Sequence, residues 1–173
     1  EAFFRRAKEF TFAPSRDGKA PWATQLAAGL RYVGAEACRE CHAEETTQWV
    51  GTRHRGAYNA VLREDRWFYP QCVSCHAVGL GEPSGFEIGD SPHTPLGLSK
   101  GGQSVGTNRL TLGLEGVQCE SCHGPGSAHV SEPTRAGSIV AIPARTVCLT
   151  CHDPRNSPGF ETDFETMSAK VRH

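Results

Sequence analysis

Apolar positions recur with a helical period in only two stretches of the chain. The first covers residues 44–63, and its apolar stripe consists of Val50, His54, Ala57, Tyr58 and Val61. This spacing predicts one amphipathic helix with His54 on its apolar face. A histidine at such a position is usually a hydrogen-bonded core residue, so its role depends on the chemistry in the rest of the chain.

The second stretch lies near the end of the sequence and consists of Phe160, Phe164, Met167 and Val171. It predicts a short helix, with His173 roughly opposite the stripe unless the last turn frays. Residues 79–110 are rich in Gly, Pro and Ser, which is typical of a surface loop or insertion. Residues 1–31 have the composition of extended coil with turns. We therefore expect a mainly α fold with extensive coil and little or no β-sheet.

The composition limits how large a side-chain core the chain can build. It has 173 residues, which is enough for one domain, but 19 are Gly, 11 are Pro and only 38% are hydrophobic. Chains with too small a core usually rely on a covalent or metal-based link. We expect residues 32–173 to form the domain, and residues 1–31 to be an N-terminal arm on it or a linker.

All eight cysteines fall into Cys-x-x-Cys pairs that are followed directly by histidine. The four motifs, numbered 1 to 4 in chain order, are Cys38/Cys41 with His42, Cys72/Cys75 with His76, Cys119/Cys122 with His123, and Cys148/Cys151 with His152. Zinc ribbons do not need the adjacent histidine, and a thioredoxin-type site needs one pair on a βαβ unit. The repetition predicts four covalent c-type haems, each held by two thioethers with the histidine as proximal iron ligand. The residues between paired cysteines differ in every motif and are expected only to bridge them.

Four histidines remain as candidate sixth ligands of the irons: His54, His93, His129 and His173. On a straight helix His42 and His54 would lie about 18 Å apart, too far to face each other across one haem. We therefore expect His54 to bind a haem held by another motif. His129 follows His123 so closely that these two are also expected to serve different, neighbouring haems. The Gly-Pro-Gly turn at residues 124–126 permits positive φ and a close approach of a haem to the backbone, although an ordinary loop would also use it.

The sixth ligand of the motif 2 haem stays open at this stage. His93 lies in GDSPHTPLG, where two prolines restrain the backbone, and a long Gly-rich loop connects it to His76. Ligation by His93 of the same chain is one possibility. An open or water-bound, high-spin haem is the second, and a ligand from another chain is the third.

Charge and hydropathy exclude some classes of protein. The polypeptide has a formal net charge of −1, and haem propionates would make the surface mildly acidic, so we do not expect a nucleic-acid-binding protein. No apolar run approaches the roughly 18 residues of a membrane span. The opening EAFFRRAKEF has no apolar signal segment, so we expect a mature chain or one cut from a longer protein. Haem attachment to such motifs normally happens outside the bacterial cytoplasm, so the expected location is periplasmic or extracellular.

The sequence resembles the cytochrome c-554 type of tetrahaem cytochrome over about residues 32–173. The resemblance rests on YVGAEACRECH with QWVGTRH, on CVSCHAVGLGEPSGF, on GVQCESCHGPG and, more loosely, on the ending FETDFETMSAKVRH. It implies a small, mostly helical multihaem cytochrome c fold with haems in stacked and perpendicular pairs. It also implies that His54 pairs with His123, His129 with His42 and His173 with His152, while the His76 haem is high-spin. Residues 1–31 lie outside the resemblance, and the loop at residues 90–113 departs from it.

These features favour an electron-transfer protein with mostly bis-His, low-spin haems. Met167 is the only methionine, so His/Met ligation, which raises haem potentials, is not expected to dominate. The expected partners are redox proteins or external electron acceptors. One alternative is a homo-oligomeric haem-wire filament with ligands or arms shared between chains. Another is a nitrogen-oxide reductase at a high-spin haem on His76, with Asp65, Glu82 or Glu87 as proton donor.

Overall fold

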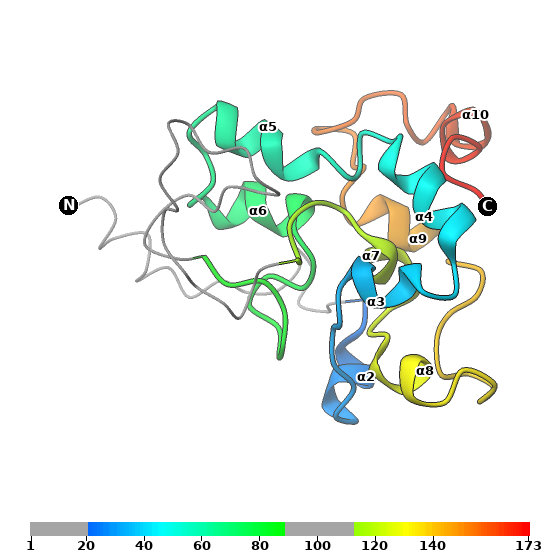
Figure 1. Cartoon of the computed structure of the whole chain (residues 1–173). Helices are drawn as coiled ribbons and strands as arrows, with labels where there is room; N and C mark the ends of the chain where they lie inside the picture. The colour runs from blue at the N-terminus through cyan, green and yellow to red at the C-terminus, as the bar shows by residue number, and fades with distance from the viewer. Residues whose placement is uncertain (1–20, 89–112) are drawn as a thin grey trace.

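The computed structural model describes residues 21–88 and 113–173, and within these ranges the chain forms short α-helices joined by coil (Figure 1). The helices are α2 (Ala23–Ala27), α3 (Ala35–Arg39), α4 (Ala43–Val50), α5 (Ala57–Arg63), α6 (Pro70–His76), α7 (Cys119–His123), α8 (Ser127–Ser131), α9 (Arg145–Leu149) and α10 (Phe164–Ser168). The only β-structure in the described ranges is an isolated antiparallel bridge between Ala77 and Glu115. The prediction of a mainly α fold with little or no sheet is confirmed.

The helix predicted for residues 44–63 is wrong in extent. It is two helices, α4 and α5, separated by a turn that contains Gly51 and Gly56. Glycine lowers helix propensity by about 1 kcal/mol relative to alanine, and the Trp49 indole nitrogen donates a hydrogen bond to the Val117 carbonyl (2.8 Å) at the end of α4. His54 therefore lies in a turn and not on a helix face. The second predicted helix is present as α10, but Phe160 precedes it in a turn.

The buried hydrophobic side chains gather around α5, α6 and the loop that follows α6. They are Trp22, Leu26, Tyr32, Tyr58, Val61, Trp67, Phe68, Val73, Ala77, Val78, Leu80, Phe86 and Leu114. By contrast, Pro125 is the only buried apolar side chain in residues 115–173, and α8 and α9 bury no residue at all. Isolated helices of this length are not stable in water. The second half of the described chain therefore has almost no apolar interior made of side chains.

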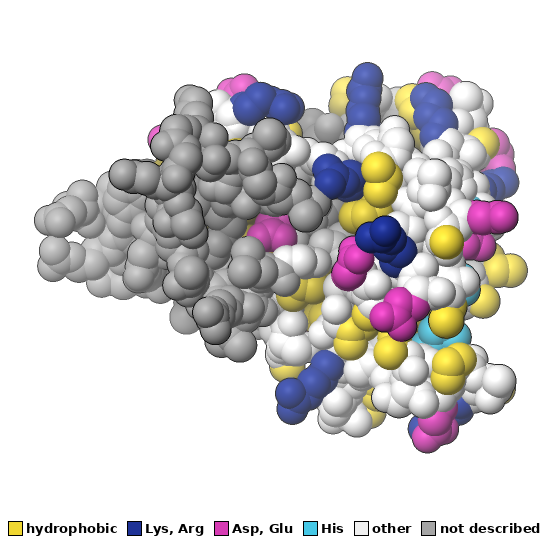
Figure 2. All heavy atoms as spheres, in the orientation of Figure 1, with side chains coloured by type: hydrophobic (Ala, Val, Ile, Leu, Met, Phe, Trp, Pro, Cys, Tyr) yellow, Lys and Arg dark blue, Asp and Glu magenta, His cyan; other side chains and the backbone are white. Residues whose placement is uncertain are grey.

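Contacts between helices place the motifs near one another. Helix α5 packs against α6, and α3 packs against both α4 and α7. Figure 1 shows α5 and α6 on one side of the molecule, with α4, α9 and α10 on the other and the end of the chain beside α4. The face in Figure 2 carries hydrophobic side chains between charges of both signs. In residues 21–88 and 113–173, no helix is long and apolar enough to cross a membrane.

The expected boundary at residue 31 stays a prediction, because residues 1–20 lie outside the described ranges. The described part of that stretch contains α2, whose Leu26 is buried in the core together with Trp22, which directly precedes the helix. Residues 21–31 thus belong to the packed part of the molecule.

Candidate haem-binding site

Each Cys-x-x-Cys-His motif forms a single helical turn. Motif 2 lies at the end of α6 and motif 3 makes up all of α7. Motifs 1 and 4 begin in α3 and α9, and the turn continues beyond each helix: the amides of His42 and His152 donate to the carbonyls of Cys38 and Cys148, both at 3.0 Å. Residues three and four apart lie on the same side of a helical turn. The two thiols and the histidine of a motif are thereby presented together, as attachment to one haem requires.

Cys41 differs from the other motif cysteines in its exposure to solvent. Its side chain is exposed, whereas the other seven cysteines are half-buried. The reason is that α3 ends at Arg39, so Cys41 lies in the turn before α4, where residues 39–44 are all exposed. Its amide still donates to the Cys38 carbonyl (3.2 Å), which keeps the thiol on the motif 1 turn. A thioether at Cys41 stays a prediction.

Three of the four motif histidines are oriented by a hydrogen bond at Nδ1. The bonds join His76 to the Ala57 carbonyl (2.6 Å), His123 to the Val140 carbonyl (2.6 Å) and His152 to the Ser157 hydroxyl (2.9 Å). A carbonyl partner requires the proton on Nδ1, which leaves the lone pair of Nε2 free for a metal. The rings of His76 and His123 are therefore set in the tautomer that binds iron through Nε2.

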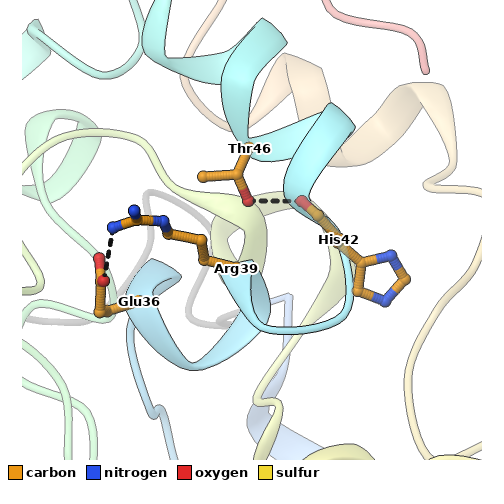
Figure 3. Close-up of polar contacts among 4 residues, drawn as sticks. All are labelled: Glu36, Arg39, His42 and Thr46. Carbon is orange, nitrogen blue, oxygen red and sulfur yellow. Dashed lines mark hydrogen bonds and ion pairs between the residues drawn. The ribbon is translucent and has the colours of Figure 1, made fainter.

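His42 is held mainly through its backbone. Its carbonyl accepts a hydrogen bond from the Thr46 hydroxyl (2.7 Å), and its ring points away from the nearby Glu36–Arg39 ion pair (Figure 3). The Glu45 carboxylate lies 3.9 Å from Nδ1. The imidazole of His42 is thus directed away from α3.

The structure brings the histidines together in three pairs. The ring centroids are 6.2 Å apart for His42 and His129, 6.0 Å for His54 and His152, and 5.7 Å for His123 and His173. Each pair contains one motif histidine and one of the histidines singled out as a candidate sixth ligand. Within the described residues no cluster of three or more His, Cys, Asp or Glu could hold a metal ion.

These separations match the spacing of two axial ligands on one haem iron. An imidazole nitrogen lies about 1.1 Å from its ring centroid and binds a first-row metal at about 2 Å, so two rings on opposite sides of an iron have centroids about 6 Å apart. A porphyrin between each pair would also supply the apolar surface that residues 115–173 lack. The residues present therefore fit covalently attached haem.

Two of the three expected pairings are wrong in the arrangement of the rings. His129 faces His42, as the family resemblance implied. His54, however, faces His152 and not His123, while His173 faces His123 and not His152. The His54 carbonyl accepts a hydrogen bond from the Val117 amide (3.0 Å), which holds the turn that carries His54.

His76 has no histidine ring facing it among the described residues. His93, the remaining candidate, lies outside these residues. Of the candidate proton donors, Glu82 accepts a hydrogen bond from the Tyr32 hydroxyl, and Asp65 accepts one from the Trp67 indole (3.1 Å). Both carboxylates therefore already have a partner in the described structure.

The thiols of different motifs lie close together. The thiol of Cys38 interacts with that of Cys119, and the thiol of Cys151 with that of Cys75. The first interaction raises the pKa of Cys38 and lowers the pKa of Cys119 to about 7. Burial raises the pKa of Cys122 to about 11, and the nearby Cys148 adds to this effect. Motif 1 therefore adjoins motif 3, motif 3 adjoins motif 4, and motif 4 adjoins motif 2.

Burial favours neutral imidazoles at the candidate ligands. It lowers the pKa of His54, of His123 and of His152, and the neighbouring charge of His152 lowers that of His54 further. At His123, the hydrogen bond to the Val140 carbonyl acts in the opposite direction. A histidine must be neutral to bind a metal, so burial prepares these three side chains for ligation.

The Gly-Pro-Gly turn between motif 3 and His129 packs closely against other parts of the chain. Gly124 has the positive φ (+87°) that glycine permits, whereas φ of Gly126 is −87°. A Cβ at Gly124 would lie 3.1 Å from the Trp22 ring, and one at Gly126 would lie 3.2 Å from a Glu120 oxygen. The glycines thus make room for Trp22 and Glu120.

Glu120 is the main residue that sequence reasoning missed. It lies between the two cysteines of motif 3, where it was expected only to bridge, yet it is fully buried. Its carboxylate accepts hydrogen bonds from the backbone amides of Val33, Gly34 and Gly126. Burial raises the pKa of Glu120, and these hydrogen bonds oppose the rise. No spacing or motif signal distinguishes this glutamate from an exposed one.

Comparison with known proteins assigns the chain to a family. The sequence model for cytochrome c554 and c-prime matches residues 37–124, which is just over half of the chain and includes motifs 1 to 3. The chain belongs to the cytochrome c554 and c-prime family. It is therefore a c-type cytochrome, a class of protein with covalently bound haem, and the predicted resemblance is confirmed.

One curated relative shows how far the similarity extends. The chain is 28% identical over 127 residues to cytochrome c-554 of Nitrosomonas europaea, which is 65% of this chain and 46% of the relative. The chain thus spans about half the length of that relative. No solved structure matches the chain.

Proposed function

We propose that the chain is an exported tetrahaem electron carrier in which three haems have two histidine ligands each. The proposed axial pairs are His42/His129 on motif 1, His123/His173 on motif 3 and His152/His54 on motif 4. The observation that carries the proposal is the separation of the paired rings, 5.7 to 6.2 Å, in three pairs that each include a motif histidine. Two imidazoles hold iron low-spin in both redox states, so little rearrangement accompanies electron transfer.

Contacts between the cysteines support a defined order of haems. The thiol of Cys38 interacts with that of Cys119, Cys122 lies near Cys148, and the thiol of Cys151 interacts with that of Cys75. Because each thiol is attached to the edge of its haem, adjoining thiols bring adjoining haem edges together. The proposed path runs through motifs 1, 3, 4 and 2, with electrons entering or leaving at the first and last haems.

For the motif 2 haem, the proposal allows three different sixth ligands. Its proximal ligand is His76, oriented by the Ala57 carbonyl, and its sixth position is taken by His93, by water or by a ligand from another chain. A bis-His centre would complete a four-haem wire. An open centre would bind small ligands, and a ligand from another chain would join subunits into a filament.

Export and partners belong to the same proposal. Attachment of haem to such motifs takes place outside the bacterial cytoplasm, so the working location is the periplasm or the cell exterior. The expected partners are redox proteins or external electron acceptors that approach an exposed haem edge. The exposure of Cys41 supports motif 1 as one such point of approach, because the haem edge attached to that thiol would face solvent.

The test is a haem count followed by electron paramagnetic resonance of the oxidised protein. Mass spectrometry of the denatured chain should show four covalent haems. The spectrum should contain low-spin signals from at least three bis-His centres, and the motif 2 haem should appear as a fourth low-spin or as a high-spin signal. Fewer than four haems, or two or more high-spin centres, would contradict the proposed ligation.

A further inference from the structure

Glu120 is a fully buried carboxylate held only by backbone amides. The Val33 amide lies 3.0 Å from both carboxylate oxygens, the Gly34 amide 2.7 Å from Oε2 and the Gly126 amide 2.7 Å from Oε1. Within the part of the chain that the structure describes, no cationic side chain forms an ion pair with it. The charge of this group is therefore not neutralised by a neighbouring lysine or arginine.

The donors around Glu120 favour the ionised form. Every group that contacts the two oxygens is an N–H donor, and a proton on the carboxyl group would have to point at one of them. A carboxylate that accepts two or three backbone N–H bonds is strongly stabilised in its charged form. Burial favours the neutral carboxylic acid, but only the ionised carboxylate can accept all of these hydrogen bonds.

The position of Glu120 links it to two haem motifs. It lies between Cys119 and Cys122 of motif 3, and the amides of Val33 and Gly34 directly precede α3, which carries Cys38 of motif 1. Through these contacts the carboxylate lies between the segment that carries motif 1 and the helix that forms motif 3.

Motif 4 has no acidic residue between its cysteines. The residues between its cysteines are Leu149 and Thr150, neither of which is ionisable. Asp153 follows the motif but is only partly buried and accepts hydrogen bonds from the amides of Arg155 and Asn156. Solvent and salt screen a charge at such a site much more than one in the interior.

We propose that Glu120 is a positioning residue whose buried negative charge sets the potentials of the motif 1 and motif 3 haems below that of the motif 4 haem. The inference rests on the proposed tetrahaem arrangement. Reduction removes one positive charge from a ferric haem, so a fixed negative charge nearby stabilises the ferric state and lowers the potential. Electrons would then pass from motifs 1 and 3 towards motif 4.

The experiment is a potentiometric titration of the holo-protein followed by electron paramagnetic resonance. Haem count and number of low-spin signals are measured first, because they test the proposed function independently of the potentials. The motif 4 signal is identified as the one altered by Ser157→Ala, since Ser157 bonds His152. The motif 1 signal is the one altered by Ser138→Ala, since Ser138 bonds His129 (3.2 Å).

Glu120→Gln removes the charge while keeping the shape. A unit charge about 10 Å away at an effective dielectric of about 20 changes a one-electron equilibrium roughly tenfold, which is about 59 mV. We expect the motif 1 and motif 3 haems to be reduced about tenfold more readily, and the motif 4 haem to change much less. Glu36→Gln removes the same charge from the exposed surface of α3 and is the matched control.

Glu120→Asp separates charge from packing. It keeps the charge but shortens the side chain, so it should lower stability and leave the potentials of these two haems near the wild-type values. Unchanged potentials in Glu120→Gln, or equal shifts of all haems, would overturn the proposal. If Glu120→Gln yields no folded protein, the wild-type order decides: a motif 1 haem reduced at a higher potential than the motif 4 haem also overturns the proposal.

Discussion

The imidazole rings of His54 and His152 lie with their centroids 6.0 Å apart and their planes inclined by 47°. His54 comes from the turn between α4 and α5, and His152 follows α9 near the end of the chain. Phe160 stacks on the ring of His152, with centroids 4.1 Å apart. A haem between the two histidines would therefore join segments that are far apart in the sequence.

The first prediction concerns that pairing. His54→Ala should leave four haems attached and convert the motif 4 haem from low-spin to high-spin, because it removes the ring that faces His152. The low-spin signal that disappears should be the one that Ser157→Ala shifts, and electron paramagnetic resonance of both variants checks this. Loss of a signal that Ser157→Ala leaves unchanged would instead support pairing with His123.

The second prediction concerns Gly116, which supports the His54 turn. It has φ of +85°, and a Cβ there would lie 2.6 Å from the Arg55 carbonyl oxygen and 3.2 Å from that of His54. Gly116→Ala should lower stability by about 1–3 kcal/mol and weaken the low-spin signal of the motif 4 haem. Thermal unfolding and electron paramagnetic resonance measure the two effects.

Gly137→Ala is the matched control for this variant. Gly137 also has positive φ (+71°), but a Cβ there would meet no atom within 4 Å. It should show the backbone strain alone, with all low-spin signals intact. An equal loss of the motif 4 signal in both variants would exclude a specific role for Gly116.

The third prediction concerns the segment that carries His173. The side-chain amide of Gln48 on α4 donates a hydrogen bond to the backbone carbonyl of Arg172 (2.7 Å), the residue directly before His173. A neutral hydrogen bond contributes about 0.5–1.5 kcal/mol, so Gln48→Ala should reduce ligation by His173 about 2- to 10-fold. The measurement is the high-spin fraction of the motif 3 haem.

Thr47→Ala provides the comparison for Gln48→Ala. The Thr47 hydroxyl bonds the Ala43 carbonyl within α4 (2.8 Å) and is exposed. Its removal should leave the motif 3 haem low-spin. A high-spin fraction that grows equally in both variants would point to a general loosening of α4.

The fourth prediction is a pH dependence. Burial lowers the pKa of His54 and of His152, so the folded state holds both in the neutral form. Below the ordinary histidine pKa of about 6.5 the unfolded chain takes up protons that the folded one resists, so stability should fall as pH falls. Unfolding midpoints between about pH 8 and pH 4, with the low-spin absorbance recorded in parallel, test the sign. A rise in stability on acidification would contradict it.

The sequence indicated which histidines could be sixth ligands of the haem irons, but not which motif histidine each of them faces. A straight helix through His42 and His54 led us to expect them on different haems, and although that helix is broken, their rings face different histidines in the structure. Which motif His54 meets depends on the break at Gly51 and Gly56 and on the bond from Trp49 to the Val117 carbonyl. These are tertiary features, which the apolar stripe in residues 44–63 does not reveal. The stripe therefore predicted one long helix where the structure has two short ones.

Burial around the motifs shows a second limit of sequence reasoning. A glutamate between two haem-attaching cysteines has the same local pattern whether it faces solvent, like Glu40, or the interior, like Glu120. The burial of Glu120 depends on the amides of Val33 and Gly34, which come from a distant segment. The exposure of Cys41 was equally hidden, because the four motifs have identical spacings. By contrast, the scarcity of sheet and the small core followed directly from the Gly and Pro content and were predictable.

The near-absence of buried apolar side chains from residues 115–173 has a consequence for the life of the chain in the cell. Newly made protein would meet the haem-attaching machinery with the cysteines of motifs 3 and 4 on an open segment, while residues 21–88 can already collapse around Val73 and Phe86. Until haem is attached, this segment would stay open to proteases, so haem attachment would complete the folding of the chain.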